Sequence, residues 1–227
     1  MLPRWADAAT AQHIPFVLMP NTSLADLRRT ATLTAEVLGG DAIRIAADFD
    51  ALFAANIRRV TERIADLPAA RRPKVLHTAS AGVLAIDGRD TVVDDWIRIA
   101  GGVNAAEIPG NGRPVTLEQV VAWDPDVIIV GSAPNPENRD AILHDPRWRQ
   151  VAAVRNGRVY ANPSGAYLWD RHSSEAALQV LWAAKTLHPE LFADIDVAAE
   201  TRRFYDRFFH RRLTDPEVRS ILEATPP

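Results

Sequence analysis

The chain has 227 residues, of which 47% are hydrophobic and 24% charged, and its formal net charge is −3. This apolar content supports a folded core, and the near-neutral charge gives no overall attraction to nucleic acid or to an anionic membrane surface. Cysteine is absent, which excludes disulfide scaffolds, thiolate zinc sites, cysteine nucleophiles and iron–sulfur clusters.

The first forty residues predict a strand followed by a helix. Residues 14–19 (IPFVLM) form a short apolar run that we interpret as a strand. Thr22 or Ser23 then offers an N-cap for a helix whose apolar residues recur at helical spacing as far as Leu38. The glycine pair that follows interrupts this helix.

A second, longer helix is predicted ahead of Pro68. Its apolar stripe runs from Ala46 to Leu67, and a stripe of about 20 residues corresponds to a length of about 30 Å. A helix of this length is either a core helix of a bundle or a rigid strut between two lobes. The pattern alone leaves both interpretations open.

From Pro73 onward, strands alternate with helices, which predicts an α/β domain with a mainly parallel sheet. The predicted strands are 75–79, 126–131 and 158–161, and the predicted helices begin near Thr91, Thr116, Glu137, Ser173 or Ser174, and Ala198. Ligands of such sheets bind beyond the carboxyl ends of the strands. The residues to consider for binding are therefore 80–82, 132–134 and 163–171.

No motif of a known enzyme chemistry is present. The sequence lacks a glycine-rich nucleotide-binding loop, a G-x-S-x-G nucleophile motif and an H-E-x-x-H zinc motif. Its six histidines are scattered, so no metal site is predicted. His77, in a predicted strand, is interpreted as a core histidine with satisfied hydrogen bonds, and Asp87 with Gly88 as a turn into the next helix.

The segment YLWDRH, which begins at Tyr167, is the richest in chemistry and lies between a strand end and a helix start. Tyr167 and Trp169 offer flat apolar area, and Arg171 offers a planar fork of donors for a carboxylate, a phosphate or another oxyanion. In the alternative, structural interpretation, Arg171 pairs with Asp170 or Glu175 and Trp169 fills the core. The spacing favours neither interpretation.

Several blocks of sequence together resemble the periplasmic substrate-binding proteins of ABC importers for iron-siderophores, haem, cobalamin and related molybdate or tungstate ligands. The blocks are HIPFVLMPNTSLADLRRTATLTAEVLGG (13–40), RPVTLEQVVAWDPDVIIVGS (113–132), RWRQVAAVRNGRVYANP (147–163) and YLWDRHSSEAALQVLWAAKTLHPELF (167–192). The resemblance covers nearly the whole chain. The tail at 200–222 resembles members that bind molybdate, tungstate or iron complexes, which favours a small anionic or metal-chelate ligand.

The resemblance implies a bilobed protein with its ligand between the lobes. It implies a C-terminal lobe that is a three-layer α/β sandwich with a mainly parallel sheet, joined by a long strut helix to a truncated N-terminal lobe. Residues 1–40 would be the remnant of the N-terminal lobe, 41–72 the connecting helix and linker, and 73–227 the C-terminal lobe with its C-terminal helices.

The resemblance also implies which residues bind the ligand. Arg171, Tyr167 and Trp169 fall in a ligand-contacting loop, and Ser80 and Arg113 fall on other loops at the edge of the cleft. The implied ligand is a metal chelate or a small oxyanion. No catalytic residue, metal ion or resident cofactor is implied.

The implied protein partner is the membrane permease of the importer. Glu118 falls where the family presents a surface carboxylate that docks on the permease. An exposed ion pair contributes only ~0–1 kcal/mol, so this contact would orient the two proteins more than bind them. The implied location is the periplasm or the cell surface.

The beginning of the chain departs from the family pattern. Family members normally carry an export signal and most of an N-terminal lobe ahead of the run at 14–19. Here residues 1–7 lack the order of an export signal, and no apolar run approaches the ~18 residues of a membrane span. We therefore expect either a fragment or a misassigned start, and an exposed apolar surface that makes the chain self-associate.

Two other classes of protein remain open. An α/β enzyme of metal-cofactor metabolism with the same lobe architecture would carry a bound cofactor or metal. A cytoplasmic interaction protein would account for the missing export signal.

Overall fold

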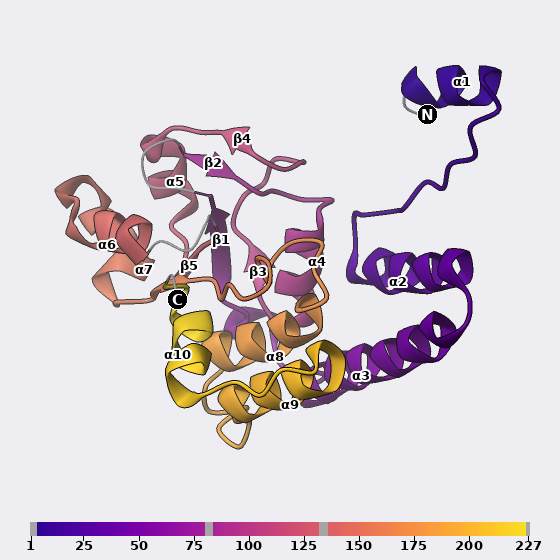
Figure 1. The fold of residues 1–227 in the computed structure, drawn as a ribbon. Helices are drawn as coiled ribbons and strands as arrows, with labels where there is room; N and C mark the ends of the chain where they lie inside the picture. Colours follow the sequence, from indigo (N-terminus) through magenta and orange to yellow (C-terminus); the bar gives the residue numbers. More distant parts are fainter. Residues whose placement is uncertain (1–3, 80–83, 132–135, 226–227) are drawn as a thin grey trace.

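A mixed β-sheet lies at the centre of the computed structural model, which describes residues 4–79, 84–131 and 136–225 (Figure 1). Its strands are β1 (Lys74–Thr78), β2 (Ala85–Ile86), β3 (Val103–Asn104), β4 (Arg113–Pro114), β5 (Val127–Val130) and β6 (Val159–Ala161). Their order is β4-β2-β1-β5-β6, and β3 also pairs with β1. β1 is parallel to β3 and β5, and β5 is parallel to β6, whereas β2 is antiparallel to β1 and β4. The three predicted strands are confirmed, and a short antiparallel pair extends their parallel sheet.

Helices cover both faces of this sheet (Figure 1). Successive strand residues point to opposite faces, so Val75 and Leu76 of β1 enter two separate hydrophobic clusters. The first cluster contains residues of α3 (Asp41–Arg63), α4 (Val92–Ile99), α8 (Ala176–Leu187), α9 (Val197–Phe209) and α10 (Asp215–Glu223), and the second contains residues of α5 (Leu117–Trp123), α6 (Pro136–His144), η2 (Pro146–Gln150) and α7 (Ala152–Arg155). The predicted three-layer α/β arrangement is confirmed.

Local sequence signals determine where the N-terminal helices begin and end. At the start of α2 (Leu24–Leu38), Ser23 Oγ accepts the backbone N–H of Asp26, whose carboxylate accepts the backbone N–H of Ser23. Gly39 and Gly40 then adopt φ values of 70° and 55°, a region that favours glycine. The predicted interruption between the two helices is confirmed, and α3 begins at the next residue.

Both of these helices are attached to the rest of the fold. Arg28 of α2 pairs with Asp50 of α3, with 2.6 Å between Nε and Oδ1. Asp95 of α4 accepts the backbone N–H of Leu24 at 2.8 Å, which attaches the start of α2 to α4. α3 has 23 residues and buries Phe53 and Val60 in the first cluster. Its role as a strut, like the division into 1–40, 41–72 and 73–227, stays a prediction.

The strand predicted at 14–19 is wrong. These residues form an extended segment that pairs with no strand in the described part of the chain, and α1 (Arg4–Ala11) precedes them at a distance from the sheet (Figure 1). An apolar run becomes a strand only where a neighbouring strand takes up its backbone hydrogen bonds. No edge of this sheet lies beside the segment, and Ile14 and Val17 are exposed.

Two further differences concern the C-terminal helices. α8 has Glu175 as its N-cap, in place of the predicted Ser173 or Ser174, and no side chain caps it. α10 was not predicted, although Thr214 caps it and Pro216 lies in its first turn, where proline is tolerated. Within the described ranges, no helix is long and apolar enough to span a bilayer.

Candidate functional site

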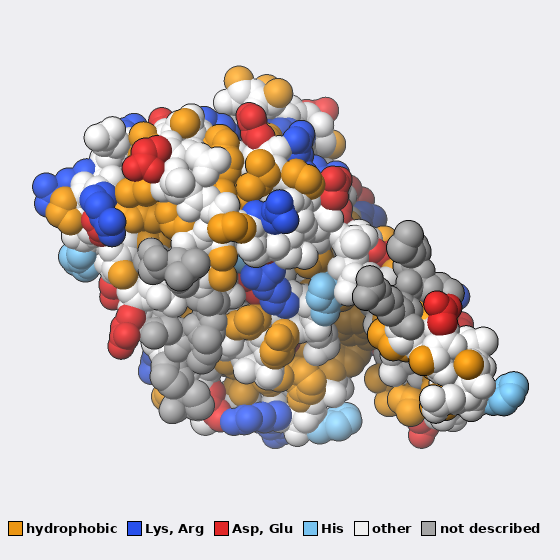
Figure 2. Space-filling view, turned by 90° about the horizontal axis from the view of Figure 1, so that it is seen from above, with side chains coloured by type: hydrophobic (Ala, Val, Ile, Leu, Met, Phe, Trp, Pro, Cys, Tyr) orange, Lys and Arg blue, Asp and Glu red, His pale blue; other side chains and the backbone are white. Residues whose placement is uncertain are grey.

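The candidate site lies where β1 and β5 end, on the side of the molecule seen in Figure 2. β1 contributes His77, the turn after β2 contributes Asp87, and the loop between β6 and α8 contributes Asp170 and Arg171. These four residues form one hydrogen-bonded set, which we call the charge network. The carboxyl end of a parallel sheet, predicted as the binding edge, therefore carries charged groups.

His77 lies at the centre of the charge network. Its Nδ1 is 2.8 Å from Asp87 Oδ2 and its Nε2 is 2.7 Å from Asp170 Oδ2. An ionised carboxylate can only accept hydrogen bonds, so both ring nitrogens donate and the imidazole is a cation. The His77 and Asp170 side chains are completely buried, and that of Asp87 is 2% exposed. The prediction of a core histidine with satisfied hydrogen bonds is confirmed.

The electrostatics favour this cationic form. Burial by itself lowers the pKa of His77, but hydrogen bonds from the ring to Asp170 and Asp87 outweigh it and leave the pKa raised. Burial likewise opposes ionisation of Asp87, yet His77 and Arg171 hold its pKa well below the usual range. Two carboxylates and two cations make the charge network neutral, so no buried charge in it is left without a countercharge.

Asp87 connects the charge network to two loops. Its Oδ2 accepts from Arg171 Nη2 at 2.8 Å as well as from His77. Its Oδ1 accepts the backbone N–H of Gly112 at 3.0 Å, directly ahead of Arg113 on β4. One buried carboxylate thus ties together the two loops that carry the predicted ligand-binding arginines. Its interpretation as a simple turn residue missed this role.

Glu175 determines the conformation of the loop that carries Tyr167. Its Oε1 accepts from the backbone N–H of Ala166 at 2.9 Å, from Trp169 Nε1 at 3.2 Å and from the hydroxyl of Tyr205, and its Oε2 accepts from the backbone N–H of Tyr167 at 2.9 Å. Burial and then the bond to Glu175 raise the pKa of Tyr205, so the hydroxyl stays protonated and donates. Among the described residues, the Glu175 carboxyl group thus receives four hydrogen bonds and forms no ion pair.

The structure separates the five predicted ligand-binding residues. Arg171 is half-buried, with 23% of its side chain exposed, and Tyr167 is 57% exposed. Arg113 is exposed on β4 and has no ion pair within the described ranges. Trp169 is 0% exposed and cannot present its ring to a ligand in this conformation, because its indole packs in the first cluster. Ser80 lies outside the described residues.

The structural alternative for this segment is correct in part. Trp169 does fill the core, as that alternative predicts. Arg171 also forms the ion pair with Asp170, with 3.9 Å between Nε and Oδ2, and in addition donates a hydrogen bond to Asp87, which was not predicted. Glu175 pairs with neither guanidinium nor imidazole, because the loop uses both of its oxygens. The remaining donors of Arg171 make no hydrogen bond to a described residue.

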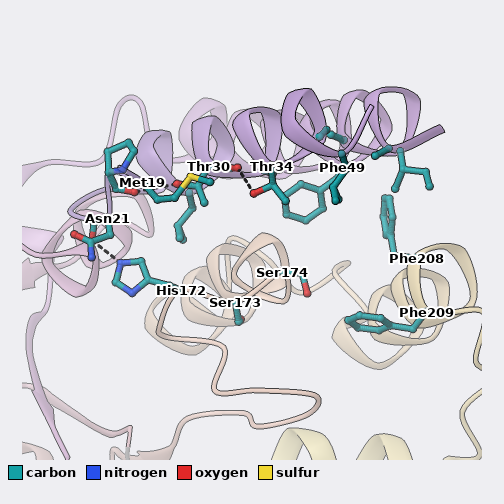
Figure 3. A pocket seen from close by; sticks show the side chains of 18 residues that line it. Met19, Asn21, Thr30, Thr34, Phe49, His172, Ser173, Ser174, Phe208 and Phe209 are labelled. Carbon is teal, nitrogen blue, oxygen red and sulfur yellow. Dashed lines mark hydrogen bonds between the residues drawn. The ribbon is translucent and has the colours of Figure 1, made fainter. Parts of the chain in front are cut away.

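An apolar groove of about 790 Å³ is lined in part by His172, which directly follows Arg171 in the chain (Figure 3). α2 and α3 form one side of it, and the segment that contains His172 and the end of α9 form the other. At one end the His172 ring bonds to the backbone oxygen of Asn21. The described residues that line this groove include no Lys, Arg, Asp or Glu, so the groove offers no countercharge for an ion.

Metal binding by the protein itself has no support within the described ranges. No group of three or more Asp, Glu or His side chains there has the geometry to hold a metal ion. His77 is the histidine closest to two carboxylates, but both of its nitrogens are engaged. Asp87 bonds to the Arg171 guanidinium through one oxygen and to the Gly112 N–H, directly ahead of Arg113, through the other; we call these two arginines the cationic edge.

Sequence reasoning missed His77, Asp87 and Asp170 as members of the site. His77 and Asp170 are 93 residues apart, so no local pattern joins them. The available signal was the placement of His77 near the end of a predicted strand, combined with the rule that ligand sites lie at strand ends.

Known proteins resemble this chain in sequence. The family model described as periplasmic binding protein matches residues 4–166. The molybdate-binding protein MolA of Haemophilus influenzae is 30% identical over 157 residues, which cover 68% of this chain and 44% of MolA. The chain therefore spans less than half the length of this relative.

Solved structures agree with this assignment. A periplasmic solute binding protein from Veillonella parvula has a TM-score of 0.79 at 28% identity, over 97% of this chain and 67% of its own. MolA bound to molybdate has a TM-score of 0.72 at 27% identity, over 84% of this chain and 57% of its own. An ABC transporter solute binding protein from Sulfurospirillum deleyianum shares the fold, with a TM-score of 0.82 at 21% identity over 96% and 68% of the two chains. With the family match over residues 4–166, these likenesses lead to one conclusion: the chain belongs to the periplasmic binding protein family.

Proposed function

We propose that this chain is the substrate-binding component of an ABC importer. It captures a small oxyanion or an anionic metal chelate in the periplasm or at the cell surface and delivers it to a membrane permease. The observation that carries the proposal is the Arg171 guanidinium, which Asp87 holds at the carboxyl edge of the sheet with part of the side chain exposed. Membership of a family of binding proteins supports capture without turnover.

Arg171 suits an anionic ligand because Asp87 holds one nitrogen of its guanidinium in place while part of the side chain is exposed. Nη2 is committed to Asp87, and the other guanidinium donors make no hydrogen bond to any residue that the structure describes. A hydrogen bond to a charged group contributes about 1.5–3 kcal/mol, so a single such contact changes affinity by roughly one to two orders of magnitude. Arg113 and Tyr167 are exposed and are proposed as further contacts, whereas Ser80 stays a prediction.

The ligand class rests on chemistry and on one relative. MolA, which is 30% identical over the matched region, binds molybdate. A dianion of that kind needs donors and positive charge, and the cationic edge supplies both. Trp169 is not proposed as a direct contact, because its ring is buried. Trp169 supports the loop that carries Tyr167 through the hydrogen bond that its indole donates to Glu175.

Replacing Arg171 with glutamine is expected to raise the dissociation constant of the ligand at least about tenfold, since a charged donor is lost at the cationic edge. Calorimetry with molybdate, a ferric siderophore, haem and cobalamin measures this. Arg147→Gln is the matched control, because Arg147 is exposed and pairs only with Asp145. Binding of none of these ligands by the wild type, or unchanged affinity in Arg171→Gln, would contradict the proposal.

Delivery to the permease is proposed to involve Glu118. It is exposed in the first turn of α5, and hydrogen bonds from its own backbone N–H and from Thr116 lower its pKa, so it is ionised. Glu118→Gln in the same series is expected to keep the wild-type dissociation constant but to reduce uptake by the permease. This variant therefore separates delivery from capture.

Self-association of the chain is proposed from its exposed apolar side chains. Val37 and Leu38 are 67% and 72% exposed, and Ile43 and the run at 14–19 are exposed beside them. Hydrophobic side chains also line the hollow between the N-terminal elements and the rest of the molecule (Figure 2). Surfaces of this kind normally mark an interface.

Sedimentation velocity should therefore show dimers or larger species at micromolar concentration. The double variant Leu38→Lys, Ile43→Lys should shift the chain toward the monomer. Val103→Lys is the control, since Val103 is exposed on the separate β3. A monomeric wild type at every concentration tested would rule this out.

A further inference from the structure

We propose that His77 is a positioning residue for ligand capture: as a buried cation it holds Asp87 and Asp170 and thereby determines where Arg171 lies and how strongly it attracts an anion. This inference rests on the proposed function for its effect on affinity. Its effect on the ligand-free protein stands on the geometry of the charge network alone.

The first step is that Asp87 is shared. The same oxygen, Oδ2, accepts from His77 Nδ1 at 2.8 Å and from Arg171 Nη2 at 2.8 Å. Asp87 therefore fixes the position of the half-buried Arg171 guanidinium, and His77 in turn fixes the position of Asp87. A movement of the His77 ring, or the loss of its proton, therefore acts on Arg171 through a single atom, Asp87 Oδ2.

The second step concerns charge. Asp170 Oδ2 is 2.7 Å from His77 Nε2 and 3.9 Å from Arg171 Nε, so His77 and Arg171 share both carboxylates. With the imidazolium present, each carboxylate has a cation of its own. Without it, two carboxylates would face one guanidinium, and their field would oppose an incoming anion.

In the described part of the chain, the titratable groups that act on the pKa of His77 are Asp170 and Asp87. Within the described ranges, α4 contributes the Trp96 ring, whose centroid is 5.9 Å from that of His77, and β5 is followed by Gly131. A Cβ on Gly131 would lie 2.1 Å from both Asp170 Oδ2 and His77 Nε2, so this contact is closed to any side chain. The charged groups that face His77 are Asp87, Asp170 and, beyond them, Arg171.

The hydrogen bonding of Asp170 also makes the charge network depend on a cation at His77. Asp170 Oδ1 is buried and has no hydrogen-bond partner among the residues that the structure describes. A buried carboxylate with one unpaired oxygen depends on its single strong bond, here the one from His77. Loss of the ring proton would leave Asp170 without any hydrogen bond from a described side chain.

The first test uses the ligand-free protein and needs no ligand. Ring ¹⁵N spectra of histidine-labelled protein should show both nitrogens of His77 protonated at neutral pH, above the ordinary pKa of an imidazole. The exposed His144, which bonds to the backbone oxygen of Asp140, serves as the internal reference for assigning the His77 signals. An unprotonated His77 nitrogen at neutral pH would overturn the inference.

The second test measures molybdate affinity against pH. Since the cationic ring favours anion binding, affinity should fall as pH rises through the raised pKa of His77, and by linkage molybdate should raise that pKa further. His77→Gln should weaken binding about tenfold at neutral pH and abolish the pH dependence. His144→Gln should keep both wild-type properties.

The outcomes separate this inference from the proposed function. A folded His77→Gln variant with wild-type affinity and wild-type pH dependence would overturn the positioning role while leaving capture intact. If the wild type binds no molybdate, the oxyanion assignment fails and the ring ¹⁵N spectra alone decide whether His77 is the cation of the charge network. If His77→Gln does not fold, the pH dependence of the wild type, set against that of His144→Gln, gives the answer.

Discussion

Replacing Glu175 with alanine is expected to lower the free energy of unfolding by about 4 kcal/mol, the range found when one partner of a buried charged set is removed. The substitution leaves the N–H of Tyr167, the indole of Trp169 and the hydroxyl of Tyr205 without their acceptor, and it leaves the N–H of Ala166 with only the Tyr205 oxygen among the described residues. Each buried donor left unpaired costs about 1–3 kcal/mol. We therefore expect the substitution to destabilise the whole loop that carries Tyr167, and not only a single hydrogen bond.

Urea unfolding followed by far-UV circular dichroism measures this effect. Glu190→Ala is the matched control, because Glu190 is exposed and pairs with Arg71 at 3.4 Å; such a pair contributes only ~0–1 kcal/mol. The role assigned to Glu175 would be refuted by a Glu175→Ala variant as stable as Glu190→Ala. Glu175→Gln should fall between them, since an amide offers one acceptor oxygen in place of two.

Adding a single methyl group at Gly131 is expected to have a comparably large effect. The Cβ of Gly131→Ala would lie 2.1 Å from both Asp170 Oδ2 and His77 Nε2, well inside van der Waals contact. The hydrogen bond between these two atoms could then not form at its present length of 2.7 Å. We expect a loss of about 3 kcal/mol, within the range reported for overpacked cores and broken buried networks.

The matched control for this prediction is Gly157→Ala. Gly157 has φ of 65° and open space around its Cβ position, so alanine there meets only backbone strain, about 1 kcal/mol. Thermal unfolding of the two variants compares a buried clash with strain at an exposed turn. If the two variants have equal melting temperatures, His77 and Asp170 can move apart with no loss of stability. That result would contradict the tight contact described above.

Elements determined by neighbouring residues could be predicted from the sequence. Helices begin at Thr91 and Thr116 as predicted: Thr116 and Gln119 form a capping box at the start of α5, and Thr91 caps α4. β5 reads as a continuous apolar run because both of its faces are buried. In these cases the determining contacts lie within a few residues, so the pattern carries the information.

The candidate site depends on contacts that no local pattern contains. Asp87 looks like a turn residue because it precedes Gly88, yet its carboxylate is buried by a loop 84 residues further on. Trp169 is of a residue type that often contacts ligands, but its hydrogen bond to Glu175 and its packing in the first cluster keep its ring buried. The run at 14–19 has the composition of a strand, and only the position of the sheet edges shows that it has no partner.

The bond between Asp95 and the backbone of Leu24 places the first turn of α2 one residue away from Trp96, whose ring rests edge-on against the imidazole of His77. The N-terminal helices are therefore connected to the charge network by a short chain of contacts that runs through the first turn of α4. An intact α2 is thus part of what surrounds the buried imidazole, although none of its residues forms a hydrogen bond or an ion pair with Arg171 or Arg113 in the described part of the chain.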